Sequence, residues 1–162
     1  TKDWKGHYWI NAYFRVFMIQ MILCLVVAAP ITVVMRSKLS SIDLFAIIGA
    51  FIAILGLIIE SFADHQMAQF QKIQPRPSKF CRMGLWKHSR HPNYFGEILF
   101  WAGIGVLALG AQHGYLGLIG PVFLTFLLLK VSGVPMLENK YKNHPEWPKY
   151  ESETRVLLPL PR

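Results

Sequence analysis

A run of polar and aromatic residues leads directly into an apolar stretch, and it holds the strongest candidates for chemistry in the chain. Residues 89–97 read Ser-Arg-His-Pro-Asn-Tyr-Phe-Gly-Glu. Pro92 predicts a helix start, because its fixed φ suits the first position of a helix. Asn93 and Tyr94 then fall in the first turn, beside free backbone N–H groups and the positive end of the helix dipole. We therefore expect an anionic or polar ligand to bind at this helix start.

The residues on either side of this helix start extend the candidate site. Arg90 and His91 would flank a phosphate or carboxylate at the helix end. Glu97 lies one turn deeper and can accept hydrogen bonds from ribose hydroxyls or an amide. An interfacial belt that anchors the helix to lipid headgroups would account for Trp86 and Lys87. It would not account for a glutamate inside an apolar segment, so we favour a ligand site.

Two carboxylates near the end of an earlier apolar segment form a second candidate group. Glu60 and Asp64 are spaced i, i+4, so a helix carries them on one face. Acidic groups near hydrocarbon are costly unless they are paired or solvated, which makes them functional candidates. The alternative is that Asp64 caps the helix end or pairs with lysines of the following loop.

Further candidates lie at and beyond the end of the last apolar segment. Glu138 is a carboxylate near the membrane boundary, and the side chain of Lys130 can extend from the segment to the interface. In the tail, Tyr150 and Arg155 would close over a bound nucleotide by stacking and by a bidentate phosphate contact. Trp147 fits interfacial packing better than ligand binding.

The composition indicates that a membrane protein holds these residues. The chain of 162 residues is 53% hydrophobic, with a mean hydropathy of +0.33, which is above the range of ordinary soluble domains. None of its long apolar segments shows the polar stripe of a soluble helix, so we predict an all-α fold, a polytopic membrane helical bundle with about four transmembrane helices. The predicted spans, each near the roughly 20 residues required, are residues 16–35, 43–63, 95–112 and 115–135.

The distribution of charge predicts the orientation of the bundle. The formal net charge is +8, yet the basic residues gather where the positive-inside rule places them and not in a nucleic-acid-binding patch. We therefore expect residues 64–93 to form a cytoplasmic loop and residues 138–162 a cytoplasmic tail. Arg36 and Lys38 are the only basic residues that do not fit this orientation.

A single membrane domain is expected over residues 1–162. Because the chain begins abruptly and without Met, it is expected to be the C-terminal part of a longer protein. Cys24 lies in a predicted span and Cys81 in the loop, so no disulfide is expected. No metal site is expected either, because no thiolate or carboxylate cluster completes the ligand-like spacing of His88 and His91.

These motifs resemble the steroid 5-alpha-reductase-like group of membrane enzymes, and most of all its bacterial-type members, which are described only as domain of unknown function 1295. The core of residues 90–94, Arg-His-Pro-x-Tyr, is shared with the isoprenylcysteine and phospholipid methyltransferases, whereas Asn93 and the Phe-Gly-Glu that follows favour the reductases. The resemblance covers nearly the whole chain. It extends over residues 13–20, Glu60 and Asp64, residues 89–97, residues 132–138, Tyr150, and Leu158-Pro159.

The resemblance implies a helical membrane fold in which NADPH enters from the cytoplasm and hydride passes to an activated carbon–carbon double bond of a lipid-soluble enone. Lys79 stands where some relatives have Arg, and Gln71 where a basic residue is often found, which leaves NADH or another nucleotide open. The catalytic residues are not implied, because in the reductases the Glu and Tyr that polarise the substrate carbonyl come from helices nearer the N-terminus. The implied cofactor contacts are Asp64, Lys79, Asn93, Glu97 and Tyr150, with Glu60 and Glu138 as further members.

Two other functions remain open from the sequence. A methyltransferase that uses S-adenosylmethionine on a lipid or prenyl-cysteine would use residues 90–94 and Glu138, without a site for a 2′-phosphate. A non-enzymatic membrane module would bind lipid headgroups through its basic loop. In each case the surroundings are a lipid bilayer, of the bacterial inner membrane or the endoplasmic reticulum. For an enzyme, a lipophilic small molecule is the expected substrate.

Overall fold

A computed structural model describes residues 9–10, 13–37, 42–75 and 78–161. These residues are mostly helical, and their only β feature is an isolated parallel bridge between Ser89 and Arg155. The prediction of an all-α membrane bundle is confirmed. The helical elements are, in chain order, η2 (Tyr13–Met18), α2 (Ile19–Val27), α3 (Ala29–Arg36), α4 (Leu44–Lys72), η3 (Gly84–Lys87), α5 (Pro92–Ala108), η4 (Gly114–Leu118), α6 (Ile119–Phe126), η5 (Leu127–Val131), α7 (Val134–Tyr141) and α8 (Trp147–Glu153).

Helix α4 is the longest element, and Asp43 fixes its start. The Oδ1 atom of Asp43 accepts a hydrogen bond from the Ala46 N–H at 2.8 Å, as the side chain of an N-cap residue does. The 29 residues of α4 extend over about 44 Å, well beyond the roughly 30 Å of bilayer hydrocarbon. The predicted span ended at residue 63, whereas the helix continues to Lys72. The first part of the predicted loop is therefore helical.

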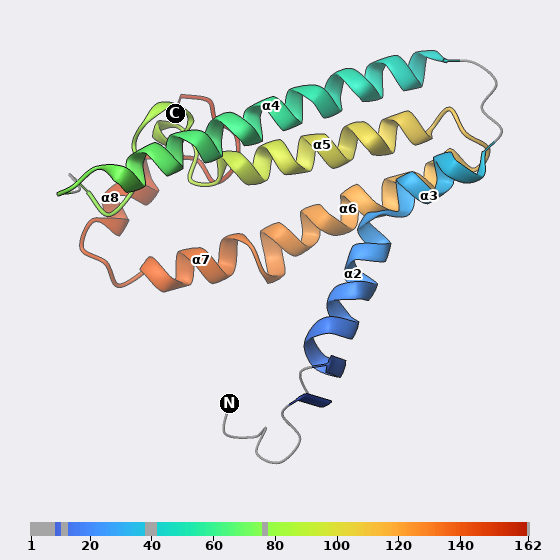
Figure 1. Cartoon of the computed structure of the whole chain (residues 1–162). Helices are drawn as coiled ribbons and strands as arrows, with labels where there is room; N and C mark the ends of the chain where they lie inside the picture. Colours follow the sequence, from blue (N-terminus) through green and yellow to red (C-terminus); the bar gives the residue numbers. More distant parts are fainter. Residues whose placement is uncertain (1–8, 11–12, 38–41, 76–77, 162) are drawn as a thin grey trace.

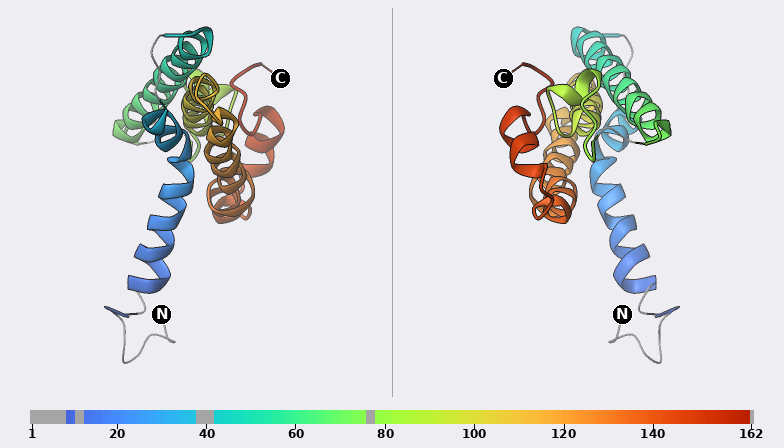
Figure 2. Two further views of the ribbon diagram at one scale, coloured as in Figure 1. Left: turned by 90° about the vertical axis from the view of Figure 1, so that its right-hand side faces the viewer. Right: turned by 90° about the vertical axis from the view of Figure 1, so that its left-hand side faces the viewer.

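Helices α4 and α5 lie side by side and run in opposite directions (Figures 1 and 2). Glycines make the contact between them very close. A Cβ atom on Gly56 would lie 2.3 Å from the Phe100 N atom, and one on Gly96 would lie 2.5 Å from the Glu60 N atom. Only a residue without Cβ fits at either position, which is the usual role of small residues between membrane helices. The contact places Glu60 against the start of α5.

The first helical segments form a bent pair. The helix of residues 13–27 and α3 meet at a bend of 53°. Pro30 lies at the start of α3 and has no N–H with which to continue the hydrogen bonding of α2. Figures 1 and 2 show α2 leaning away from the rest of the bundle. Its apolar side chains, among them Ile22 and Leu25, are largely exposed.

The described residues provide two or three candidate membrane spans. Leu44–Lys72 and Gly114–Tyr141 are long and apolar enough to cross a bilayer, and the bent pair adds a third if it crosses as one span. Helix α5 has 17 residues, or about 25 Å, which is less than the thickness of the hydrocarbon. The total of four spans therefore stays a prediction.

The second long helix consists of four pieces and is followed by a tail that turns back. Elements η4, α6, η5 and α7 continue one another from Gly114 to Tyr141. Within them, η5 is π-helical, and the Ser132 N–H donates to the Leu127 carbonyl at 2.9 Å. After α7 the chain passes through α8 and returns to the segment that precedes α5 (Figure 1). Most of the candidate functional residues lie at this end of the bundle.

Candidate functional site

The loop between α4 and α5 is attached to α4 by two side-chain hydrogen bonds. The indole N–H of Trp86 donates to the Ala63 carbonyl at 2.8 Å, and Oε1 of Gln66 accepts from the Leu85 N–H at 2.9 Å. Trp86 is buried, in a small core packed around Ala63. The interpretation of Trp86 as part of an interfacial belt is therefore wrong, because this side chain anchors the loop to the protein.

The tail lies parallel to the segment that leads into α5. The Arg90 N–H donates to the Arg155 carbonyl at 2.8 Å, and the Arg155 N–H donates to the His88 carbonyl at 3.1 Å. The hydroxyl of Ser89 is buried and donates to the Leu157 carbonyl at 2.7 Å. These bonds hold the tail in a fixed register against the start of α5.

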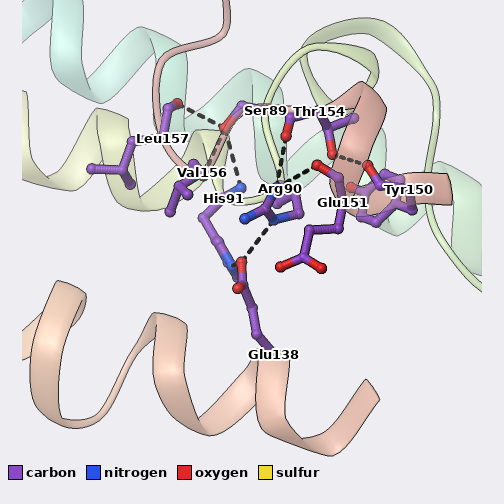
Figure 3. A network of polar contacts seen from close by, with 9 residues as sticks. All are labelled: Ser89, Arg90, His91, Glu138, Tyr150, Glu151, Thr154, Val156 and Leu157. Atoms are coloured by element: carbon purple, nitrogen blue, oxygen red, sulfur yellow. Dashed lines mark hydrogen bonds and ion pairs between the residues drawn. The ribbon is translucent and has the colours of Figure 1, made fainter. Parts of the chain in front are cut away.

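Glu138 of α7 joins this network from the opposite side (Figure 3). Its Oε1 atom accepts from Nε of Arg90 at 2.7 Å and lies 3.1 Å from Nε2 of His91. The Nη1 atom of Arg90 donates to the backbone carbonyls of Glu151 and Thr154 at 3.1 and 2.6 Å. Only 7% of the Arg90 side chain is exposed, so solvent screens this ion pair little. Arg90 thus joins the start of α5 to α7 and to the end of α8.

Aromatic side chains from the loop, α7 and α8 form one wall. The ring of Phe80 stacks on that of Tyr150, with 4.8 Å between the centroids and 8° between the planes. Tyr141 and Trp147 meet Phe80 edge-on, at 5.4 and 5.5 Å between centroids. The guanidinium of Arg82 lies 5.3 Å from the centre of the Tyr150 ring. Contacts of these kinds are favourable for aromatic rings and fix their orientation.

A cavity of about 300 Å³ lies between this aromatic wall and the start of α5. The end of α4 contributes Met67 and Phe70 to its lining, and Arg90 and Glu138 contribute the ion pair. Mostly apolar and aromatic walls with a few convergent polar groups are typical of sites for small molecules, and this volume is at the small end of their range.

Asn93 lines this cavity and carries an unpaired polar atom. Its Oδ1 atom is buried and has no hydrogen-bond partner among the described residues. Leaving a buried carbonyl oxygen unpaired costs about 1–3 kcal/mol. An N–H group of a ligand in the cavity would remove this cost.

Two further groups line the cavity in their neutral forms. Burial raises the pKa of Tyr150 to about 12. Burial also raises the pKa of the Cys81 thiol, although a hydrogen bond with the backbone of Met83 partly offsets the rise. At neutral pH, Tyr150 therefore carries a hydroxyl that can donate a hydrogen bond, and Cys81 is a poor nucleophile.

Comparison with known protein families identifies the family of this chain. A family model described as "Protein of unknown function (DUF1295)" matches residues 1–154. The chain belongs to this family. Because the match covers nearly the whole chain, it confirms the resemblance found in the motifs.

The chain is also distantly similar to steroid 5-alpha-reductases. The 3-oxo-5-alpha-steroid 4-dehydrogenase 1 of Homo sapiens is 26% identical over 119 residues, which are 70% of this chain and 41% of the relative. The protein of the same name from Rattus norvegicus is 26% identical over 112 residues, 66% of this chain and 38% of the relative. The chain thus spans about two fifths of the length of these relatives. No solved structure matches it.

The cavity collects seven of the eleven predicted cofactor residues, from the loop, α5, α7 and α8. The rings of His91 and Tyr94 are stacked, with 5.2 Å between their centroids. For all seven residues, contact with a cofactor stays a prediction, whereas the structure shows that they line one cavity. The seven are Lys79, Arg90, His91, Asn93, Tyr94, Glu138 and Tyr150.

The other four predicted residues do not line the cavity. Glu60 lies where α4 meets Gly96, and the charges of Glu60, Asp64 and Glu97 are close enough to interact. Asp64 is exposed. Arg155 lines a separate hollow, which shares no described residue with the cavity.

The cavity also contains residues that the sequence analysis did not single out for ligand binding. Phe80 forms the centre of the aromatic wall, and no local pattern distinguishes it from other loop aromatics. Met67 and Phe70, which line the cavity, do have a signal, because with Ala63 their i, i+4, i+7 spacing continues a buried helical face beyond the predicted span. That spacing would have predicted the longer α4.

Proposed function

We propose that the protein is a membrane-embedded reductase that uses NADPH to reduce a carbon–carbon double bond in a lipid-soluble, steroid-like or enone substrate. Membership of the family and the distant similarity to 3-oxo-5-alpha-steroid 4-dehydrogenases support this proposal. The observation that carries it is the cavity at the start of α5, with the buried and unpaired oxygen of Asn93. The cavity lies at the end of the bundle where a cytoplasmic cofactor is expected to enter.

The residues of the cavity fit one end of a dinucleotide. The Asn93 oxygen can accept a hydrogen bond from the nicotinamide carboxamide or from the amino group of adenine. The rings around Phe80 offer flat surfaces to a planar base, and Lys79 offers a cation for a phosphate. Bound NADPH supplies the hydride, while the protein orients the cofactor and excludes water from it.

The acidic cluster next to the cavity is proposed to take part in binding the same cofactor. Glu97 follows Asn93 by four residues, so both lie on one face of α5. Glu60 and Asp64 face it from α4 and interact with its charge. Carboxylates accept hydrogen bonds well from ribose hydroxyls, and a ribose beside the cavity would bring such donors.

A methyltransferase that uses S-adenosylmethionine is the second candidate function. Its support is the cavity volume of about 300 Å³, which suits a single nucleoside as well as one end of a dinucleotide. The network of Arg90, His91 and Glu138 occupies the corner that this function would also use. The relatives described above carry the name of an oxidoreductase, 3-oxo-5-alpha-steroid 4-dehydrogenase 1, so the reductase is the first proposal.

Parallel titrations of the purified protein with NADPH, NADH and S-adenosylmethionine test the proposal. We expect NADPH to bind with the highest affinity. Asn93→Ala should weaken NADPH binding about tenfold or more, because it removes the buried acceptor. The control is Asn143→Ala, which alters an exposed asparagine outside the cavity and should leave the affinity unchanged.

Two results would contradict the proposal in different ways. Binding of S-adenosylmethionine alone, weakened by Asn93→Ala, would assign the cavity to the methyltransferase. Equal losses in the Asn93 and Asn143 variants would place the cofactor outside the cavity. A loss confined to Asn93→Ala with NADPH as the preferred ligand supports the reductase.

A further inference from the structure

A second hollow lies where the long C-terminal helix meets the returning tail. It has a volume of about 540 Å³ and lies between η5, the start of α7 and residues 155–158. Its lining differs from that of the cofactor cavity, with which it shares no residue. Of the residues that the structure describes, those that line it are two cations, Lys130 and Arg155, and otherwise apolar side chains.

The two cations of the hollow have no carboxylate partner within the part of the chain that the structure describes. No acidic residue lines the hollow, and neither Lys130 nor Arg155 takes part in an ion pair among the described residues. Among the described residues, the Arg155 guanidinium donates only to the carbonyl of Pro161, which lies 3.2 Å from Nη2. Two like charges in one hollow repel each other unless an anion lies between them. The charge of the hollow therefore favours an anionic occupant.

The apolar residues of the hollow indicate that this occupant has an apolar part. Leu129, Val134 and Leu157 line the hollow itself. Val131 and Leu160, which are close in sequence to these lining residues, also have exposed apolar side chains. A soluble anion gains nothing from such walls, whereas an amphipathic anion buries hydrocarbon against them.

Contacts within the protein set the backbone positions of both cationic residues before any ligand arrives. Lys130 lies in the π-helical η5, a local widening that is frequent at functional sites. The turn that follows requires a glycine, because a Cβ on Gly133 would lie 2.6 Å from the Leu128 carbonyl oxygen. Arg155 is fixed by its two backbone hydrogen bonds to the segment before α5. A lysine whose side chain only extended to the membrane interface would require neither the π-helical η5 nor the turn at Gly133.

We propose that this hollow binds the phosphate of an anionic phospholipid, with Lys130 and Arg155 pairing the phosphate and the leucine and valine side chains holding the adjoining hydrocarbon. Basic pockets beside membrane helices bind anionic headgroups in this manner. The hollow lies in the C-terminal half of a candidate span, close to residue 135, where the sequence predicts that the span leaves the hydrocarbon and reaches the headgroups. The site is separate from the cofactor cavity and does not depend on the proposed reductase activity.

Native mass spectrometry of the detergent-solubilised protein tests this site with two lipids of equal chain length, dioleoyl phosphatidylglycerol and dioleoyl phosphatidylcholine. We expect the anionic lipid to bind at least about fivefold more tightly. Lys130→Gln should weaken its binding about fivefold, since each cation near a headgroup contributes about that factor. Lys130→Arg should retain the affinity, which shows that the substituted site still folds. Lys142→Gln, a change at an exposed lysine outside the hollow, is the matched control.

Three outcomes would overturn the proposal. Equal binding of the two lipids would show that the charge of the lipid does not determine binding. Equal losses of affinity in the Lys130→Gln and Lys142→Gln variants would show that the lipid does not bind in the hollow. Displacement of the anionic lipid by millimolar inorganic phosphate would assign the two cations to a soluble phosphate. Retention of the lipid in excess phosphate, with a loss confined to Lys130→Gln, supports a lipid site whether or not the protein binds NADPH.

Discussion

Arg90 connects more parts of the candidate site than any other single residue described above. Its side chain donates to Glu138 and to two carbonyls of the tail, and its backbone N–H donates to Arg155. These bonds occupy Nε and Nη1, so we expect Arg90 to act mainly as a positioning residue that holds Glu138 and the tail around the cavity. A charged group with so many fixed partners is costly to disturb.

At this scale, we predict that Glu138→Gln lowers the stability of the fold by about 1–3 kcal/mol, because Arg90 and His91 lose their anionic acceptor in a shielded position. The measurement is the thermal midpoint in detergent. The control is Glu153→Gln, which removes the exposed ion pair with Arg82 and should change the midpoint little. Equal shifts in the two variants would contradict a special role for the buried pair.

The packing of α4 on α5 is the element-scale feature that positions the site. We predict that Gly96→Ala destabilises the protein by about 1–3 kcal/mol, because its Cβ would meet the backbone of Glu60. In an isolated helix, the change from glycine to alanine stabilises by about 1 kcal/mol. A loss of stability in Gly96→Ala would therefore come from the contact between α4 and α5. Unfolding monitored in detergent measures it. The control is Ala68→Gly on an exposed face of α4, which measures the change in helix propensity alone. A Gly96→Ala variant with unchanged stability would refute the close contact.

The start of α5 could be predicted from local sequence, but contacts between segments that are distant in the sequence could not. Pro92 begins α5 as its fixed φ indicated, and Asn93 was recognised from its place in the first turn. The bond from Ser89 to Leu157 has no such local sign, because it depends on how the tail returns. The same reason explains why Phe80 was missed, since its stacking partner Tyr150 comes from α8.

The orientation of the whole molecule can be tested by cysteine labelling. With Cys24 and Cys81 replaced by alanine, we predict that Gln74→Cys and Tyr115→Cys, both exposed, react on opposite sides of the membrane. The distribution of basic residues predicts that position 74 is cytoplasmic. The measurement is labelling by an impermeant maleimide in sealed vesicles of known orientation. Labelling of both positions from one side would refute the predicted topology.

The bridge between Ser89 and Arg155 also sets an order of events during synthesis. A chain emerges from the ribosome N-terminus first, and early segments fold before late ones exist. Helices α4 and α5 can therefore pack while α8 and the tail are still unmade. Until the tail pairs with the segment before α5, Ser89 and Arg90 lack their partners and the aromatic wall lacks Tyr150. We expect the cavity to be completed last, so that a nascent chain has its helices before it has a binding site.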